Sequence, residues 1–166
     1  MNRPIYLDYA ATTPIDEAVL EKMLPFMSRE GQFGNPGSSS HVYGWEAQEA
    51  VEEARSVVAD LINADPSEIF WTSGATEADN LALKGICSDS QGKKHLITSS
   101  LEHKAILDCC RYLERQGHQI DYVQPNKCGT LTSAEIANVI KEGLSSVVSV
   151  MPVSYTHLTL PTKNEV

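Results

Sequence analysis

Residues 95–123 read HLITSSLEHKAILDCCRYLERQGHQIDYV, two apolar segments with an amphipathic segment between them. Residues 95–98 and 119–123 have the length and composition of strands, whereas apolar residues recur at helical spacing over 102–116. Gly117 stands where such a helix should end. This order predicts a βαβ unit, whose two strands are parallel. The inward positions of the helix should be Ile106, Leu107, Cys110 and Leu113.

The same alternation extends to both sides of this unit. Upstream, an apolar strand is expected at 68–72 and a helix at 76–86. Downstream, Thr132 and Glu135 have the spacing of a capping box, which predicts a helix to about residue 142. A valine-rich strand should follow at 146–151. We therefore expect an α/β fold with four strands in a mainly parallel sheet, flanking helices and right-handed crossovers.

The first part of the chain is expected to be mostly helix and loop. The amphipathic pattern of its longest helix has acidic residues on the outer face, and Asp65-Pro66 should stop that helix. The expected elements are a strand at 5–7, a helix at 17–29 capped by Asp16 and bent or broken at Pro25, a loop at 30–40, and a helix at 45–62.

Composition restricts the class of protein. The 166 residues suffice for one domain, and 22 acidic against 13 basic residues give a net charge of −9. That charge argues against nucleic-acid binding, which requires a basic face. No apolar run approaches the ~18 residues that cross a bilayer, and the N-terminus lacks the apolar core of a signal peptide. We expect a cytoplasmic protein that binds neither nucleic acid nor membrane.

The four cysteines do not suggest a metal site. None of them shows Cys-x-x-Cys spacing, and a closed zinc site usually has four spaced ligands. Cys109 and Cys110 are adjacent within the helix expected over 102–116. We interpret them as residues of a helix face.

The end of the strand expected at 68–72 carries a candidate phosphate site. There Thr72-Ser73-Gly74-Ala75-Thr76-Glu77 leads into a helix, whose free N–H groups and dipole favour an anion. Small side chains let the backbone approach the anion, and Thr76 adds a hydroxyl donor. The segment is neither a P-loop nor a dinucleotide fingerprint. The alternative is an ordinary capped strand–helix turn, which these residues alone favour.

A second polar strand end is Ser99-Ser100-Leu101-Glu102-His103-Lys104. Ligands of open α/β sheets bind beyond the carboxyl ends of the strands. His103 could stack its ring on a flat cofactor or relay a proton near neutral pH. A surface position or a helix cap is the alternative.

Five segments in order make the chain resemble the cysteine desulfurases, pyridoxal-phosphate enzymes of fold type I in the class V aminotransferase group. The resemblance covers about residues 4–151, with the fold of an incomplete large domain. The segments are Tyr6-Leu7-Asp8-Tyr9-Ala10-Ala11-Thr12-Thr13, Phe33-Gly34-Asn35-Pro36, Thr72-Ser73-Gly74-Ala75-Thr76-Glu77, Glu102-His103-Lys104-Ala105 and Val147-Val148-Ser149-Val150-Met151.

The resemblance implies a cofactor, a substrate and partners. The cofactor would be pyridoxal 5′-phosphate, with its phosphate held by Ala75 and Thr76. His103 would stack on the pyridine ring and assist proton transfer, and Ala10-Ala11-Thr12 would lie near the active site. The substrate would be L-cysteine, converted to alanine and an enzyme persulfide for iron–sulfur cluster assembly. A homodimer would pass this sulfur to scaffold or carrier proteins.

The sequence departs from the family pattern at Pro152. Two asparagines and a glutamate are expected after Met151, and residues 152–166 do not show them. We expect this tail to be foreign to the domain. The family's cofactor-binding lysine, its aspartate facing the pyridine nitrogen and its sulfur-accepting cysteine have no match here, so the chain alone should be inactive.

Three other interpretations remain open. The chain could be a non-catalytic fragment that pairs with a full-length subunit. It could come from another class V enzyme, such as a selenocysteine lyase. It could also be a generic binder of phosphorylated ligands on an α/β sheet.

Overall fold

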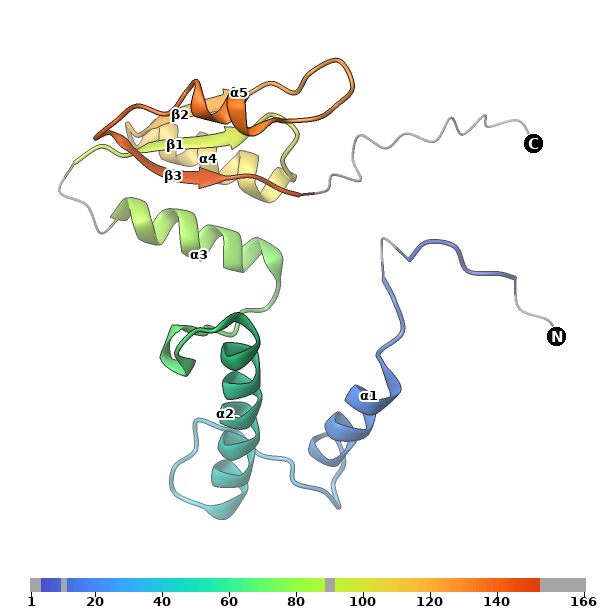
Figure 1. Ribbon diagram of the computed structural model, residues 1–166. Helices are drawn as coiled ribbons and strands as arrows, with labels where there is room; N and C mark the ends of the chain where they lie inside the picture. Colours follow the sequence, from blue (N-terminus) through green and yellow to red (C-terminus); the bar gives the residue numbers. More distant parts are fainter. Residues whose placement is uncertain (1–3, 10–11, 89–91, 153–166) are drawn as a thin grey trace. The chain divides into compact units, whose positions relative to one another are not determined.

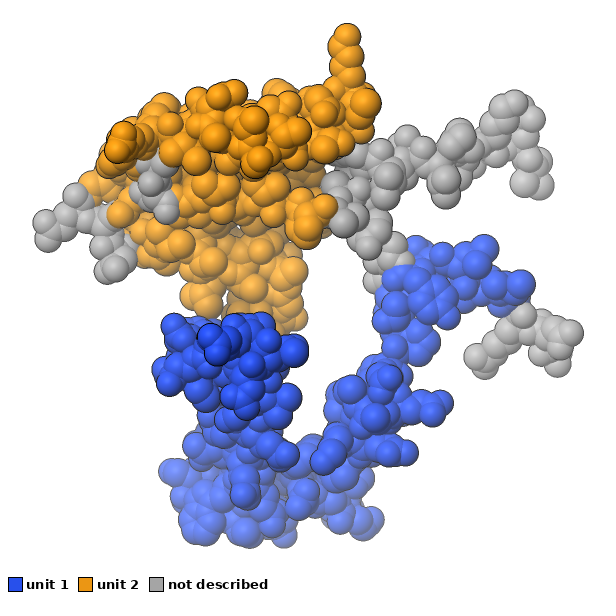
Figure 2. Space-filling model, in the orientation of Figure 1, with its two compact units in different colours: residues 1–71 blue, residues 72–166 orange. Residues whose placement is uncertain are grey.

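The computed structural model describes residues 4–9, 12–88 and 92–152. The chain forms two compact units, a first unit of residues 1–71 and a second unit of residues 72–166, coloured separately in Figure 2. Within the described residues, all strands belong to the second unit.

The second unit is built on a three-stranded parallel sheet in the order β2-β1-β3 (Figure 1). Its strands are β1 (His95–Ser99), β2 (Gln119–Val123) and β3 (Ser145–Ser149). Every residue of the central strand β1 is buried. The βαβ unit and the parallel sheet predicted from residues 95–123 are confirmed.

Three helices accompany this sheet. They are α3 (Ala75–Ser88), α4 (Lys104–Arg115) and α5 (Ser133–Ala137). Helix α4 packs against α3 and β2. The cluster of buried side chains between these elements consists of Leu83, Cys87, Leu96, Ile106, Cys109, Cys110 and Leu113. Cys109 and Cys110 therefore lie on a buried helix face, as expected, whereas Leu107 is only half-buried.

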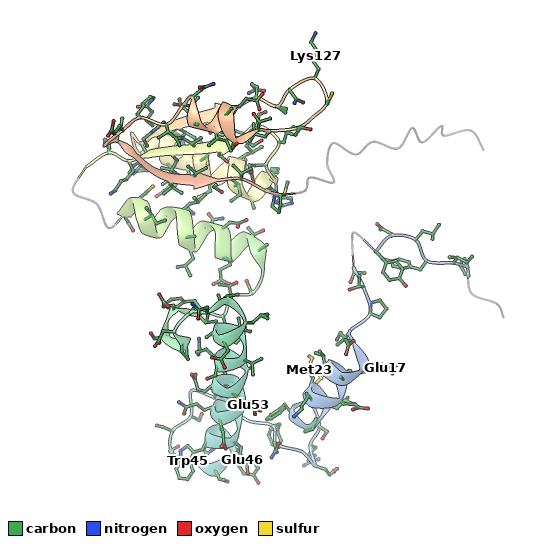
Figure 3. The ribbon with its side chains drawn as sticks, viewed as in Figure 1. Glu17, Met23, Trp45, Glu46, Glu53 and Lys127 are labelled. Carbon is green, nitrogen blue, oxygen red and sulfur yellow. The ribbon has the colours of Figure 1, made fainter. Side chains whose placement is uncertain are left out.

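Helix α5 begins as the sequence predicts but is shorter. Thr132 and Glu135 form the predicted capping box. The helix ends at Ala137 instead of residue 142, because the next N–H groups bond three residues back, Ile140 to Ala137 among them. A turn precedes the helix at residues 126–129, where the Gly129 N–H donates to the Asn126 carbonyl at 2.9 Å, and Figure 3 shows Lys127 projecting away from its loop.

The predicted strand at 68–72 is wrong. A 3₁₀ helix, η2 (Pro66–Glu68), precedes this segment, and the segment itself packs against α2 (Val42–Ile62). The Arg55 guanidinium of α2 donates to the carbonyl of Ile69 and lies 5.7 Å from the centre of the Trp71 ring. No described segment pairs with these residues, so the sheet has three described strands instead of four.

The first unit also contains α1 (Glu17–Met23) and the 3₁₀ helix η1 (Leu24–Phe26). Asp16 caps α1 by accepting from the Ala18 N–H at 2.9 Å, and the α-helix ends before Pro25, as predicted. The strand expected at 5–7 is wrong, since these residues are exposed and unpaired.

Helix α2 begins three residues earlier than its apolar pattern predicts. The Nδ1 atom of His41 caps it by accepting from the Gly44 N–H at 3.2 Å. A Cβ atom at Gly44 would lie 1.9 Å from the Ser38 carbonyl oxygen, so only glycine fits there. Among the described helices, none is both long enough and apolar enough to cross a lipid bilayer.

Candidate functional site

The candidate site lies at the carboxyl end of the sheet in the second unit. Figure 1 shows that the arrows of β1 and β3 point toward the end at which α3 and α4 begin. Helices α3 and α4 pack against each other, and the Asp79 charge of α3 contributes to the raised pKa of both Glu102 and Cys109. Helix N-termini and strand ends therefore meet at one edge, where α/β sheets bind ligands.

The N-terminus of α3 presents backbone donors without partners. The N–H groups of Glu77 and Ala78 both bond to the Gly74 carbonyl at 3.1 Å. The N–H groups of Ala75 and Thr76 make no hydrogen bond within the described residues, and both residues are exposed. Gly74 has a φ of 156°, which brings the chain sharply into the helix. These donors, the Thr76 hydroxyl and the helix dipole suit a phosphate.

Glu77 organises the turn that precedes this helix. Its Oε2 atom accepts from both the N–H and the hydroxyl of Ser73, each at 2.6 Å. These hydrogen bonds lower the pKa of the Glu77 carboxyl, which is therefore ionised at neutral pH. Sequence reasoning did not assign this role. The signal for it is a carboxylate in the first turn that can reach back to a serine just before the helix.

His103 is the cap of α4. Its Nδ1 atom accepts from the Ala105 N–H at 3.1 Å, and its side chain is exposed. Because Nδ1 is the acceptor, the neutral ring carries its proton on Nε2. The structure thus contains the cap that sequence reasoning offered as the alternative. Stacking of the exposed ring on a cofactor stays a prediction.

Glu102 is a site residue that sequence reasoning missed. It is 6% exposed, and its Oε1 atom accepts from the Met151 N–H at 2.6 Å. Burial raises the pKa of the Glu102 carboxyl, and the charge of Asp79 raises it further. The only signal in the sequence is an acidic residue that follows an apolar strand by three residues, just before a helix.

The segment predicted at residues 10–12 and one hollow in the second unit are not assigned to this site. Ala10 and Ala11 are outside the described residues, and Thr12 belongs to the first unit. A hollow of about 480 Å³ opens near the amino ends of β1 and β2, lined by Lys93 and His118 among others. It is therefore not part of the candidate site.

The comparison with family models identifies the family. The model described as "Aminotransferase class-V" matches residues 5–159. The chain belongs to the aminotransferase class-V family. Among curated family members, cysteine desulfurase IscS of Pseudomonas aeruginosa (strain LESB58) is 55% identical over 155 residues, which are 93% of this chain and 38% of the relative. The chain thus spans little more than a third of that relative.

Solved structures agree with this class-V assignment. A NifS-like protein superposes with a TM-score of 0.80 at 38% identity, covering 90% of this chain and 40% of that one. A structure described as SspA in complex with cysteine gives a TM-score of 0.77 at 38% identity, covering 87% of this chain and 41% of that one. The three-stranded sheet and its helices therefore match about two fifths of each of these larger proteins, which agrees with the α/β fold of an incomplete large domain that the sequence resemblance implied.

Proposed function

We propose that this chain is the front part of a pyridoxal-phosphate-dependent cysteine desulfurase. The observation that carries the proposal is the 55% identity over 155 residues to a protein named for that activity. The relative that was solved with cysteine supports the choice of an amino-acid substrate. Because the chain spans only 38% of the curated relative, the activity is proposed for the whole protein.

The N-terminus of α3 would hold the cofactor phosphate. Ala75 and Thr76 offer two unpartnered N–H groups, and Thr76 offers a hydroxyl, all at the positive end of a 14-residue helix. The Ser73 donors are already taken by Glu77, so the anion would be bound by residues 75 and 76. When bound, pyridoxal phosphate supplies an electron sink for bond cleavage at the substrate's α-carbon.

His103 would orient the ring of the cofactor and exchange a proton at Nε2. Its Nδ1 atom is fixed by the Ala105 N–H, which leaves Nε2 and the ring faces accessible. Imidazole can both give and take a proton near neutral pH. The capping bond sets which nitrogen does so, because a proton on Nδ1 would break it.

The resemblance to cysteine desulfurases supports a proposal for the reaction and its setting. L-Cysteine would be the substrate, and alanine and an enzyme persulfide the products. We propose a cytoplasmic homodimer that passes the sulfur to scaffold or carrier proteins for iron–sulfur cluster assembly. The lysine and the cysteine that complete this chemistry would lie outside the matched segment, so this chain alone should not turn over cysteine.

We also propose that residues 152–166 are foreign to the domain. The asparagines and glutamate expected after Met151 are missing, although the family match continues to residue 159. Sequencing the source DNA across codons 145–170 tests this. A frame that continues from Met151 into the family pattern supports the proposal, and a confirmed reading of residues 152–166 contradicts it.

A chimaera tests the proposed activity. Residues 5–151 would replace the corresponding segment of the Pseudomonas aeruginosa relative, and alanine formed from L-cysteine would be measured. We expect activity in the chimaera and loss of bound cofactor in its Thr76→Val form. Gly85→Ala, in the same helix but with open space around it, is the matched control and should keep the cofactor. A folded chimaera that retains cofactor but forms no alanine would contradict the proposal.

A further inference from the structure

A buried carboxylate connects the turn that carries His103 to the end of another strand. Glu102 is only 6% exposed, yet it follows β1 by three residues, at an edge where neighbouring residues are exposed. Its Oε1 atom accepts from the N–H of Met151, two residues beyond β3, at 2.6 Å. This distance is at the short end of the usual range for N–H···O hydrogen bonds.

This bond continues the pairing of β1 and β3 beyond the sheet. The last paired residues of the two strands are Thr98 and Ser149, and the Thr98 hydroxyl also donates to the Ser149 carbonyl at 2.9 Å. The β1–β3 register ends at that pair. Glu102 then reaches across from the β1–α4 turn and provides the Met151 N–H with an acceptor where no strand carbonyl does so.

The β1–α4 turn is also hydrogen-bonded to the end of β2. The Ser100 N–H donates to the carbonyl of Val123 at the end of β2, at 3.1 Å. The Ser99 hydroxyl oxygen accepts from the Leu101 N–H at 3.0 Å. The turn between β1 and α4 is therefore bonded to β2 through its backbone and to β3 through the Glu102 side chain.

The placement of Glu102 is electrostatically unfavourable in itself. Burial raises the pKa of its carboxyl, and the Asp79 charge adds to this, while only the Met151 N–H favours the ionised form. A buried carboxylate next to another acid destabilises a fold unless a specific contact compensates for it. The hydrogen bond from the Met151 N–H offsets part of this cost.

We propose that Glu102 is a positioning residue, which fixes the backbone of the β1–α4 turn to the end of β3 and so sets the direction of the adjacent His103 ring. This deepens the proposed function, because the site it serves is the proposed cofactor site. His103 would be held from two sides, by its own bond to the Ala105 N–H and by the anchored backbone of its neighbour.

The test compares Glu102→Ala with two other variants of the whole chain. Glu102→Gln keeps an acceptor for the Met151 N–H and should therefore behave like the wild-type chain, in contrast to Glu102→Ala. Thr98→Val is the matched control, because it removes a side-chain hydrogen bond between the same two strands without touching the turn. All three can be studied at low concentration by hydrogen exchange and mass spectrometry.

Three readouts are measured. They are amide exchange in peptides that contain Met151, the pH profile of exchange at the His103 ring C2 position, and affinity for pyridoxamine 5′-phosphate, which cannot condense with lysines. Glu102→Ala should speed Met151 exchange about tenfold, shift the His103 profile and weaken the ligand about tenfold, as loss of one hydrogen bond implies. Thr98→Val should change neither the His103 profile nor the affinity.

Two results would overturn the proposal. One is a His103 profile that Glu102→Ala leaves unchanged, and the other is an equal effect of Glu102→Ala and Thr98→Val on His103. Failure of the wild-type chain to bind pyridoxamine 5′-phosphate would instead count against the proposed function. In that case, amide exchange at Met151 and ring C2 exchange at His103 would still decide the role of Glu102.

Discussion

The four cysteines have different surroundings, which should set how each thiol reacts. Cys128 is exposed on the 126–129 turn, whereas Cys87, Cys109 and Cys110 are buried. Burial raises the pKa of all three buried thiols, and that of Cys110 to about 12. The thiolate is the reactive form, so these three should be inert in the folded chain.

We therefore predict one fast-reacting thiol. A chromogenic disulfide reagent at pH 8 should label Cys128 quickly and the other three only after denaturation. Mass spectrometry would identify the labelled residue, and Cys128→Ser should abolish the fast phase. Rapid labelling of Cys109 or Cys110 without denaturant would show that the packing of α4 against α3 is wrong.

Asp121 should make the stability of the second unit depend on pH. Its carboxylate accepts from Lys141 Nζ at 3.1 Å and from Nε2 of the buried His95 at 2.9 Å. These partners, Lys141 first, lower the pKa of Asp121 below its ordinary 3.8. The unfolded chain then binds the proton more tightly, so this stabilisation is present above pH 3.8 and is lost as the pH falls through the folded value.

The variant Asp121→Ala tests this effect. At pH 7 it should lower the free energy of unfolding by about 1–3 kcal/mol, because His95 loses its acceptor. Urea denaturation followed by circular dichroism at several pH values measures the difference from wild type. That difference should shrink as the pH falls below 3.8. A difference that stays constant with pH would contradict the account.

At the scale of elements, sequence reasoning succeeded where local signals and packing agree. Helix α4 and strands β1 and β2 were predicted because an apolar face, a glycine stop and short apolar runs coincide with what the fold buries. The strand at 68–72 failed for a long-range reason, since Arg55 of α2 bonds to Ile69 and stacks on Trp71. An apolar run alone cannot reveal such a contact.

In the candidate site, too, the residues with a local sequence signal were predicted and the residue with a long-range contact was not. The α3 turn was found because small residues before a helix are a local signal, and its free N–H groups at Ala75 and Thr76 agree with that inference. Glu102 was missed because its partner, Met151, lies 49 residues away in the sequence. The roles of Ala75, Thr76 and His103 toward a cofactor stay predictions.

Two glycines in helices should respond oppositely to alanine. A Cβ atom added at Gly44 in α2 would lie 1.9 Å from the Ser38 carbonyl oxygen. Gly44→Ala should therefore destabilise the first unit by about 1–3 kcal/mol. Gly85 in α3 is exposed with nothing nearby, so Gly85→Ala should stabilise the second unit by about 0.5–1 kcal/mol. Both tryptophans lie in the first unit, so their fluorescence follows Gly44→Ala, and circular dichroism follows Gly85→Ala. Equal effects of the two substitutions would contradict these packing assignments.

At the scale of the whole molecule, many large apolar side chains are exposed. In the second unit Leu81 is 54% exposed, Ile86 45% and Val148 49%. Strand β3 lies at an edge of the described sheet, and exposed apolar edge strands promote association. The curated relative is much longer, and the matched segment is 38% of its length.

We expect the isolated chain to self-associate as its concentration rises. Val148→Lys should reduce this, because a charge on an edge strand opposes strand-to-strand contact. Val57→Lys, on the exposed face of α2, changes the net charge equally and is the control. Sedimentation velocity over a concentration series measures the effect. Association reduced equally by both substitutions would point to net charge instead of the β3 edge.

The central claim is that the start of α3 binds the phosphate of a pyridoxal cofactor. Ala75→Pro tests it most directly, because proline is tolerated at the first position of a helix but has no N–H. The measurement is equilibrium dialysis of the chain with pyridoxamine 5′-phosphate, with pyridoxamine as the phosphate-free control. The account predicts binding by wild type, about tenfold weaker binding by Ala75→Pro, and little binding of pyridoxamine. Equal binding of both ligands, or an Ala75→Pro chain that binds as tightly as wild type, would contradict it.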